Sequence, residues 1–456
     1  MRTRAVATFA LAVALTAGAG CSDQTPVGPT TPPSLARVGG GGGAGGARRH
    51  VILMREGRTS IADLAARVHA LGGRVMREHA DIGVLTVSGL SDDALASLAA
   101  RGDVEAVEAD QRVRMIPPLG ALGTQRLTAQ TDQSGAFFFP AFQWNMRQIR
   151  ADKAWLVTHQ GAGALVCILD TGIDPDHIDL AGKIDLGLST SFVDSEPDVL
   201  DRAGHGTFVA GIISSNGLGV ASVAPDARLC ALKVLDQTGV GSFSDLIAAI
   251  VYAAQHHVDV INMSLNAYFP IQTRDDLELV AAVQRAIDFA LRRGTLPVAA
   301  AGNDTANLAT DPRNFISIPA QLRGVVSVGA TAPINQMDFD RIAGYSDVGF
   351  PGVDVFAPGG DFIPGQSVQQ DLIISPCSGL VCGGEDFYLI GAGTSFAAPH
   401  VAGQAAVIIS DARHRIGPVL LTACIEATAD HPTGRFIDPL YGHGRIDVLK
   451  SALCRR

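Results

Sequence analysis

The hydrophobic pattern of residues 50–115 switches between the period of a strand and the period of a helix. "HVILM" is typical of a short strand, and "SIADLAARVHALGG" carries apolar residues at helical spacing and ends at glycine. "RVMREH" and "GVLTVSGL" predict two strands joined by a turn at Asp81–Gly83. A capped helix in "SDDALASLAARGDV" and a closing strand in "VEAVEAD" follow. The order β-α-β-β-α-β predicts a small ferredoxin-like α+β unit.

From Trp144 onward the pattern alternates between continuous apolar segments and amphipathic ones. The apolar segments predict strands buried on both faces, which is typical of parallel sheets; they are "ALVCILDTG", "ARLCALKVLD", "VDVINMSL", "LPVAAAGN" and "VVSVGA". The segments between them predict helices: "GTFVAGIISS", "FSDLIAAIVYAAQHH" and "LELVAAVQRAIDFALRRG". We therefore expect an α/β fold with a doubly wound, mostly parallel sheet, whose functional sites form at the carboxyl ends of strands.

Composition and charge exclude several classes of protein. The chain has 456 residues, of which 47 % are hydrophobic and only 18 % charged, as in a folded protein with a large core. Its formal charge is −10 and it has no basic run, which argues against nucleic acid as a partner. Every long apolar stretch beyond residue 20 is interrupted by charge, Gly or Pro, so no membrane-spanning helix is needed.

The first 47 residues have the features of an export signal and a tether. Arg2 and Arg4 precede an apolar run that ends in "AGAGC", which predicts a signal peptide over 1–21 and a secreted, extracellular protein. Cys21 resembles the acylated cysteine of bacterial lipoproteins, although Gly18 stands where that motif usually has Leu. The sequence leaves open whether Cys21 is lipidated, with a membrane-anchored precursor, or lies near an ordinary cleavage site. Residues 22–47 are rich in Pro and Gly and predict a flexible tether.

Six cysteines follow Cys21, and an exported chain can oxidise them. Cys377 and Cys382 lie in one Gly-rich loop and are the first candidate pair; Cys424 and Cys454 are the second. Cys167 and Cys230 lie inside apolar strands, where we expect plain buried side chains. No spacing of these cysteines indicates a zinc site.

Four short stretches carry candidate chemistry, each with a plain structural alternative. Asp170 ends a buried strand in "CILDTGID", where an Asp could also cap the next turn. His205 lies between two glycines before an apolar helix, although an isolated histidine is usually structural. Asn303 follows a strand in "AAAGN", and its amide could donate to an oxyanion. Ser395 in "GTSFAAPHVAG" is either a nucleophile or the cap of the helix that follows it.

These four motifs, in the chain order Asp, His, Ser, closely resemble those of the subtilisin-like serine peptidases. The likeness covers about residues 144–450 and includes "LDTGID", "GHGTFVAG", "INMSL", "AAAGN" and "GTSFAAPHVAG". It implies a serine endopeptidase with Ser395 as nucleophile, His205 as base, Asp170 as its orienting acid and Asn303 as oxyanion donor. It also implies a polypeptide substrate that binds as an added strand. The residues implied for substrate binding are Gly241, Ser242, Ser264, Leu265, Asn266, Ala301, Gly302 and Ser317, with a cis bond at Ile318–Pro319.

The same resemblance implies a precursor that processes itself. Residues 48–115 are similar to the inhibitory propeptide domain of this family, 116–141 would be a linker with the maturation site, and 142–456 the catalytic domain. In this interpretation the propeptide is an intramolecular inhibitor, and the membrane is a partner only through a lipid on Cys21. Two alternatives stay open: 48–115 could be an independent partner-binding module, and the whole fold could be a catalytically silent binding or regulatory protein.

Three departures from the family pattern affect specificity, oxidation and metal binding. Asn266 replaces a usual Gly in the wall of the primary pocket, and Phe396 replaces the commoner Met beside the nucleophile.

Catalysis of this kind requires no cofactor or metal. Asp179 matches one ligand of a family calcium site whose loop is shorter here and whose other ligands are not evident, so structural calcium is left open.

Overall fold

The computed structural model describes residues 48–55, 60–115, 120–123, 133–271, 274–384, 386–412 and 416–454. The chain divides into two units, 1–37 and 38–456, and every described residue belongs to the second. The predicted signal peptide, Cys21 and the whole of the tether lie outside the described residues. Within the described ranges no helix combines the length and the apolar character needed to cross a membrane.

Residues 49–109 form a four-stranded antiparallel sheet with two helices. Their elements are β1 (Arg49–Met54), α1 (Ile61–Ala70), β2 (Arg74–His79), β3 (Val84–Ser88), α2 (Asp92–Ala99) and β4 (Val104–Ala109), and the strand order is β2-β3-β1-β4. Ser60 and Ser91 cap the two helices, because their hydroxyl groups accept hydrogen bonds from main-chain N–H groups of the first turns. The elements follow one another in the order that the sequence predicts.

The larger part of the chain is built on a seven-stranded parallel sheet. The strand order is β16-β15-β13-β11-β7-β9-β8. The strands are β7 (Leu165–Asp170), β8 (Thr190–Ser191), β9 (Arg228–Lys233), β11 (Val260–Met263), β13 (Leu296–Ala300), β15 (Val326–Thr331) and β16 (Val355–Pro358). The predicted doubly wound, mostly parallel α/β fold is confirmed.

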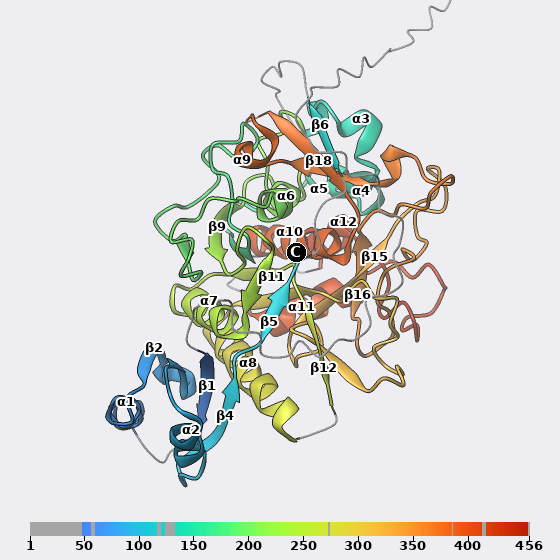
Figure 1. Ribbon diagram of the computed structural model, residues 1–456. Coiled ribbons are helices and arrows are strands. Elements are labelled where there is room, and N and C mark those ends of the chain that lie inside the picture. The colour runs from blue at the N-terminus through green and yellow to red at the C-terminus, as the bar shows by residue number, and fades with distance from the viewer. Residues whose placement is uncertain are drawn as a thin grey trace, which may run out of the picture. The chain divides into compact units, whose positions relative to one another are not determined.

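Helices cover both faces of this sheet, as the continuous apolar strands require (Figure 1). Val166 and Ile168 of β7 belong to a core shared with α6 (His205–Ile213) and α10 (Thr394–Asp411). The alternate residues Cys167 and Leu169 belong to the core on the other face, shared with α7 (Phe243–Gln255) and α8 (Arg274–Arg293). Because side chains alternate along a strand, β7 is buried between two helical layers.

The strand order changes direction at β7. The chain leaves β7 for β8 and β9 on one side and later returns to β11 on the other, so neighbouring connections run in opposite directions at this point. Ligands of open α/β sheets bind at the carboxyl end of such a switch point. Asp170, the last residue of β7, lies at this end.

Among the described residues, three small sheets and several short helices complete the fold. The small sheets are β10-β5, β12-β14 and β17-β18-β6. The remaining elements are η1 (Ala80–Ile82), β5 (Arg112–Arg114), β6 (Gly120–Gly123), η2 (Gln133–Gly135), α3 (Phe139–Phe142), α4 (Trp144–Gln148), α5 (Ala151–Ala154), β10 (Val240–Ser242), β12 (Ala267–Pro270), β14 (Phe315–Ile318), η3 (Gln369–Asp371), β17 (Ile373–Pro376), α9 (Gly379–Cys382), β18 (Phe387–Gly391), α11 (Pro418–Ala427) and α12 (Val448–Ala452).

The disulfide pattern corrects one sequence-based expectation. The pairs Cys377–Cys382 and Cys424–Cys454 are disulfide-bonded, as the sequence suggested. Cys167 and Cys230 also form a disulfide, so the prediction of plain buried side chains was wrong for them. The two residues are direct partners across β7 and β9, with their Cα atoms 4.5 Å apart. The Ile318–Pro319 bond is cis, as expected.

The part of the fold built on the parallel sheet includes packed residues before position 142. Gln133 donates from its side-chain amide to the Ser215 carbonyl and accepts from the Ser222 N–H at 2.8 Å. The ring of Phe138 packs on that of Tyr388, with centroids 5.2 Å apart. Residues 133–141, which the sequence assigned to the linker, are therefore packed against this part of the fold.

Candidate functional site

Asp170 and His205 form a buried pair at the carboxyl end of β7. Nδ1 of His205 lies 2.7 Å from Oδ1 of Asp170, and neither residue is exposed to solvent. The same oxygen accepts the N–H of Thr171 at 2.8 Å. A carboxylate beside Nδ1 favours the tautomer with the proton on that nitrogen, which leaves Nε2 with its lone pair. Nε2 has no hydrogen-bond partner within the described residues.

The helix that carries His205 is held at its start by Asp201, a residue that the sequence reasoning missed. Oδ1 of Asp201 accepts from Thr171 Oγ1 and from the main-chain N–H groups of Ala203 and Gly204, at 2.8 to 3.0 Å. Oδ2 accepts from the N–H and the hydroxyl of Thr207 at 2.8 and 2.7 Å. The carboxylate therefore joins the end of β7 to the first turn of α6. The sequence feature that could have identified this residue is an Asp four positions before His205, where an Asp often caps a helix.

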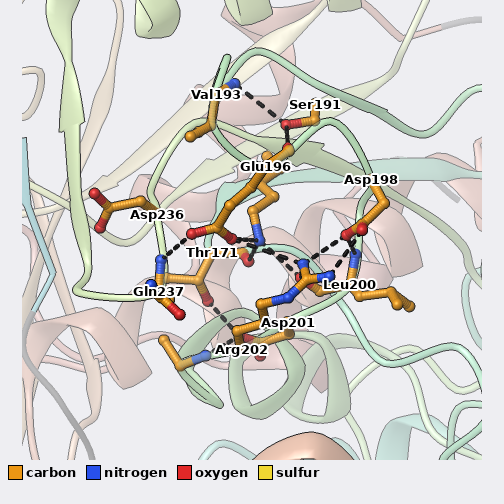
Figure 2. A network of polar contacts seen from close by, with 12 residues as sticks. Thr171, Ser191, Val193, Glu196, Asp198, Leu200, Asp201, Arg202, Asp236 and Gln237 are labelled. Carbon is orange, nitrogen blue, oxygen red and sulfur yellow. Dashed lines mark hydrogen bonds and ion pairs between the residues drawn. The ribbon is translucent and has the colours of Figure 1, made fainter.

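A buried lysine ties a neighbouring loop to the same strand end. Nζ of Lys233, the register partner of Asp170, donates to the carbonyl groups of Thr171 and Leu200 and pairs with Glu196 at 2.7 Å. Lys233 is not exposed, and a buried ammonium group is stable only when it is paired in this way. Figure 2 shows this network, in which the Glu196 carboxylate and the carbonyl groups of Thr171 and Leu200 meet at the ammonium group. Asp201 contacts Thr171, and Arg202 pairs with Asp198 at the edge.

Ser395 lies in the first turn of α10, which begins one residue earlier, at Thr394. Oγ of Ser395 donates to the carbonyl oxygen of Ser264 at 3.2 Å, and Oγ of Ser264 donates to the carbonyl oxygen of Ser395 at 2.6 Å. The Ser395 hydroxyl is thus bonded to main chain rather than to His205. Phe396, the next residue, lies with its ring centroid 5.6 Å from that of His205 and 4.2 Å from that of Phe208, so α10 and α6 pack together here.

Asn303 is fixed by the residue that precedes Ser395. Oδ1 of Asn303 accepts from the N–H of Thr394 at 2.9 Å and from its hydroxyl at 3.0 Å. Because the side-chain oxygen is occupied, the amide NH2 is the group of Asn303 that is left to donate. The arrangement places an amide donor beside the N-terminus of α10, where exposed N–H groups favour negative charge.

The space beside Gly302 is filled by polar side chains from distant segments. A Cβ on Gly302 would lie 2.1 Å from the Tyr268 hydroxyl and 2.3 Å from Oδ2 of Asp347, and its φ is +134°, so only glycine fits. Tyr268 donates to this Asp347 oxygen at 2.6 Å, while Oδ1 accepts the N–H groups of Asp304 and Ala306. Burial raises the pKa of Asp347 to about 7. The amide nitrogen of Asn266 also reaches this space and lacks a partner among the described residues.

Three of the residues implied for substrate binding, Gly241, Ser242 and Asn266, pair with a strand of the chain itself, β5. Val113 pairs with Gly241 and Arg112 with Ser242, in antiparallel register. Arg114 and Asn266 exchange two main-chain hydrogen bonds of 3.3 and 3.1 Å. An extended segment of the chain, β5, therefore lies between these two edges.

Three other residues of the predicted site have purely internal contacts. The Ser317 hydroxyl donates to the Ala301 carbonyl at 2.8 Å, and both residues are buried. The side chain of Leu265 is buried in the core that also contains α7 and α8. Ser317, Ala301 and Leu265 thus support the walls of the site from behind.

His400, the histidine nearest to Ser395 in sequence, is part of the core. Its Nδ1 lies 2.8 Å from the Phe396 carbonyl oxygen and its Nε2 lies 2.9 Å from the Asn145 amide nitrogen. Complete burial lowers its pKa to about 4, so it is neutral near pH 7. Both ring nitrogens are occupied, which removes His400 as a base for Ser395.

The surroundings of Asp179 do not fit a calcium ion. Its two oxygens accept the main-chain N–H groups of Leu218, Gly219 and Val220 and the hydroxyl of Tyr388, at 2.7 to 2.9 Å. Hydrogen-bond donors surround the carboxylate where a cation would need further oxygen ligands. In the part of the chain that the structure describes, no group of three or more His, Cys, Asp or Glu side chains could hold a metal.

Comparison with known proteins finds one family that matches more than half of the chain and solved structures that share its fold. The profile of the Subtilase family matches residues 161–444. A thermophilic serine proteinase of Bacillus sp. (strain AK1) is 34% identical over 313 residues, which cover 68% of this chain and 67% of that one. Thermitase of Thermoactinomyces vulgaris is 30% identical over 318 residues, or 69% of this chain and 97% of thermitase. The epidermin leader peptide processing serine protease of Staphylococcus aureus, at 23% identity, shares the fold with a TM-score of 0.72 over 89% of this chain and 97% of its own.

Proposed function

The chain belongs to the subtilase family and is a serine-type endopeptidase, and we propose that Ser395, His205 and Asp170 carry out its catalysis. Ser395 Oγ attacks the carbonyl carbon of the scissile bond while Nε2 of His205 takes its proton. The observation that carries this proposal is the buried contact of 2.7 Å between His205 Nδ1 and Asp170 Oδ1, with Nε2 left free. The Ser395 hydroxyl must turn from the Ser264 carbonyl toward Nε2, because catalytic hydrogen bonds often form only when substrate is bound. Subtilases need no cofactor for this chemistry.

Asn303 and the N–H of Ser395 would stabilise the oxyanion of the tetrahedral intermediate. The Asn303 oxygen is held by Thr394, so its amide NH2 is oriented before the reaction begins. Such a donor, placed before charge develops, typically contributes about 2.7–4 kcal/mol of transition-state stabilisation. The N-terminal dipole of α10 acts in the same direction.

A fluorophosphonate probe tests this assignment directly, because only an activated serine reacts with it. We expect covalent labelling at Ser395, which His205→Ala and Ser395→Ala abolish. Ser214→Ala serves as a control, since Ser214 is also buried but its hydroxyl donates to the carbonyl groups of Pro225 and Ala227. A chain that hydrolyses no peptide and takes no label would instead be a silent binding or regulatory protein.

Residues 48–115 would act as the intramolecular inhibitor of this site. Arg77 pairs with Asp245 at 2.6 Å, Arg285 pairs with Glu105 at 2.7 Å, and the carboxylate of Asp110 accepts the N–H and the hydroxyl of Ser244. These contacts fix the small unit to α7 and α8 and direct β5 between the two substrate edges. A substrate cannot pair with Gly241 while β5 does.

We further propose that the precursor cleaves itself, with Ser395 as the nucleophile of the first cut. Ser395→Ala should accumulate as a full-length, inactive precursor on a gel. The purified fragment 48–115, added back to mature enzyme, should inhibit it. Normal maturation of Ser395→Ala in a protease-deficient host would show that another enzyme makes the cut, and a lack of inhibition by the fragment would favour an independent binding module.

We also propose that the protein is secreted and that its precursor is anchored to the membrane through Cys21. Lipid on Cys21 would lie on the propeptide side of the maturation cut, so processing would free the peptidase from the membrane. Fractionation distinguishes the alternatives: Ser395→Ala precursor should stay with membranes, and the wild-type catalytic domain should be soluble. Soluble Ser395→Ala precursor would rule out the anchor without affecting the peptidase assignment.

A further inference from the structure

Two polar side chains close the space between two segments of the proposed site. The segment 264–266 follows β11 and the segment 301–302 follows β13, and these two strands are neighbours in the parallel sheet. A Cβ atom placed on Gly302 would lie within 3.0 Å of both the Tyr268 hydroxyl and the Asn266 amide nitrogen. Side chains from the first segment and from β12, which continues it, therefore reach the main chain of the second.

The same space would receive a substrate side chain in the proposed reaction. Asn303, which directly follows Gly302, would hold the oxygen of the scissile carbonyl group. Asn266 pairs with an extended strand through its main chain. A bound residue that places its carbonyl group at Asn303 therefore has its side chain between Asn266 and Gly302.

Tyr268 is held in this position from three sides. Its hydroxyl donates to Oδ2 of Asp347 at 2.6 Å, and its ring packs edge-on against Phe315 with the centroids 4.8 Å apart. In the small sheet its main chain is opposite Ser317. The N–H of Asp347 donates to the Gly302 carbonyl at 3.0 Å, which ties the carboxylate to the same wall. Moving the tyrosine aside would leave a buried carboxylate oxygen without this hydrogen bond, so the ring stays in the space.

The Asn266 side chain offers a donor that nothing in the described part of the chain uses. Its amide nitrogen is buried and lacks a hydrogen-bond partner among the described residues. A buried donor without a partner is unfavourable, so a bound group that accepts from it gains affinity. The hydroxyl group of a small substrate side chain can accept in this way.

We propose that Tyr268, held by Asp347, limits the depth of the pocket for the residue that carries the scissile carbonyl, so that the enzyme cleaves after small residues, and after serine in particular. The proposal rests on the proposed function, because it takes Asn303 and Ser395 as the groups that bind this carbonyl. Asp347 is a positioning residue, since Tyr268 and two main-chain N–H groups occupy its oxygens. Aromatic and long side chains are excluded because they would have to displace a packed ring.

Peptide substrates that differ only in the residue before the cleaved bond test the depth of the pocket on the mature enzyme. We expect kcat/KM to be at least about 10-fold higher with alanine or serine at this position than with phenylalanine or arginine. Tyr268→Ala should raise the ratio of kcat/KM for phenylalanine over alanine by at least about 10-fold. Tyr268→Phe, which removes the hydroxyl and keeps the ring, should raise it by less. A ratio of two substrates does not depend on the amount of folded enzyme, so partial misfolding of a variant does not affect the result.

Tyr252→Ala is the matched control for the tyrosine variants. Tyr252 lies on α7 with its ring stacked on His256, at 3.9 Å between centroids, so its loss should leave the ratio of the two substrates unchanged. A wild-type enzyme that cleaves after phenylalanine as fast as after alanine, or a Tyr268→Ala ratio equal to that of the wild type, would overturn the proposed pocket. Absence of both fluorophosphonate labelling and cleavage after every residue would instead overturn the proposed function.

A pair of substrates of equal size tests the role of the Asn266 amide. Serine and 2-aminobutyrate differ only in that a hydroxyl group replaces a methyl group, and we expect kcat/KM to be about 5-fold higher with serine. Asn266→Leu keeps a similar side-chain shape without the donor, so this preference should disappear. The same preference for serine in Asn266→Leu and in the wild type would overturn the role of Asn266 in choosing among small residues.

Discussion

Ser264 and Ser395 hold each other through two reciprocal hydrogen bonds. The Ser395 hydroxyl donates to the Ser264 carbonyl oxygen at 3.2 Å, and the Ser264 hydroxyl donates to the Ser395 carbonyl oxygen at 2.6 Å. The Ser264 hydroxyl in turn accepts from the Asn262 side-chain amide at 2.9 Å. This chain of bonds fixes the first turn of α10 to the end of β11, so the position of Ser395, the proposed nucleophile, depends on the Ser264 side chain.

Ser264→Ala should therefore lower both stability and turnover. It leaves the buried Asn262 amide and the Ser395 carbonyl without partners, and an unsatisfied buried group costs about 1–3 kcal/mol. We expect a lower free energy of unfolding, measured by urea in an inactive His205→Ala background, and a lower kcat in the active enzyme. Ser214→Ala is the control, because the Ser214 hydroxyl also donates to main-chain carbonyls but at Pro225 and Ala227. An equal fall in kcat for both variants would contradict a specific role of Ser264.

Asp201→Asn should misplace His205 without changing any group that touches substrate. An amide can accept with one oxygen only, so either the contacts of Thr171 or those of Thr207 are lost. Hydrogen bonds to a charged group contribute about 1.5–3 kcal/mol, and we expect a loss of stability of that order. As a positioning residue, Asp201 should affect kcat more than KM. Asp198→Asn, in the same loop but paired with Arg202 at the surface, should change neither.

Asp347 should make stability fall as the pH rises. Burial raises its pKa to about 7 in the folded protein, against about 3.9 in an unfolded chain. Between these two values the folded state holds the extra proton, so the free energy of unfolding decreases by up to about 1.4 kcal/mol per pH unit. Asp347→Asn should remove this decrease, seen in urea unfolding of the Ser395→Ala precursor at pH 5 and pH 8.

A second variant checks the cause of this pH dependence. The hydrogen bond from Tyr268 stabilises the charged form of Asp347 and lowers its pKa, so Tyr268→Phe should extend the decrease to higher pH. If Asp347→Asn and the parent chain show the same pH dependence, Asp347 does not hold a proton in the folded state.

The sequence predicts the strands, the helices and the four motifs because their signals are local. Apolar runs and helical spacing identify β7, β9 and α7, and the residue order around Asp170, His205 and Ser395 identifies the family. Contacts between distant segments give no such signal. The Cys167–Cys230 bond depends on β7 and β9 being neighbours, which strand order alone decides.

The missed parts of the site have the same physical origin. Tyr268 and Asp347 are 79 residues apart in sequence, and only the folded chain brings them to Gly302. Strand β6 reads "GALG", which has neither alternation nor β-branched residues, so its pairing with β18 is imposed by the neighbouring strand. Asp201 has a local signal, but its bond to Thr171 requires the end of β7 to be in place.

Phe396 should make the enzyme tolerant of peroxide. It is fully buried, with its ring against Phe208 and beside His205, and it follows the proposed nucleophile Ser395 directly. A methionine there can be oxidised to a sulfoxide, which is polar and larger and would disturb both the core and the oxyanion donors. Phenylalanine has no such reaction, so activity should survive mild peroxide, whereas Phe396→Met should lose activity with time. Phe396→Leu controls for the loss of the ring, since leucine cannot be oxidised in this way. Residual activity is measured after matched peroxide treatment, and equal inactivation of the wild type and Phe396→Met would mean that peroxide acts at another residue.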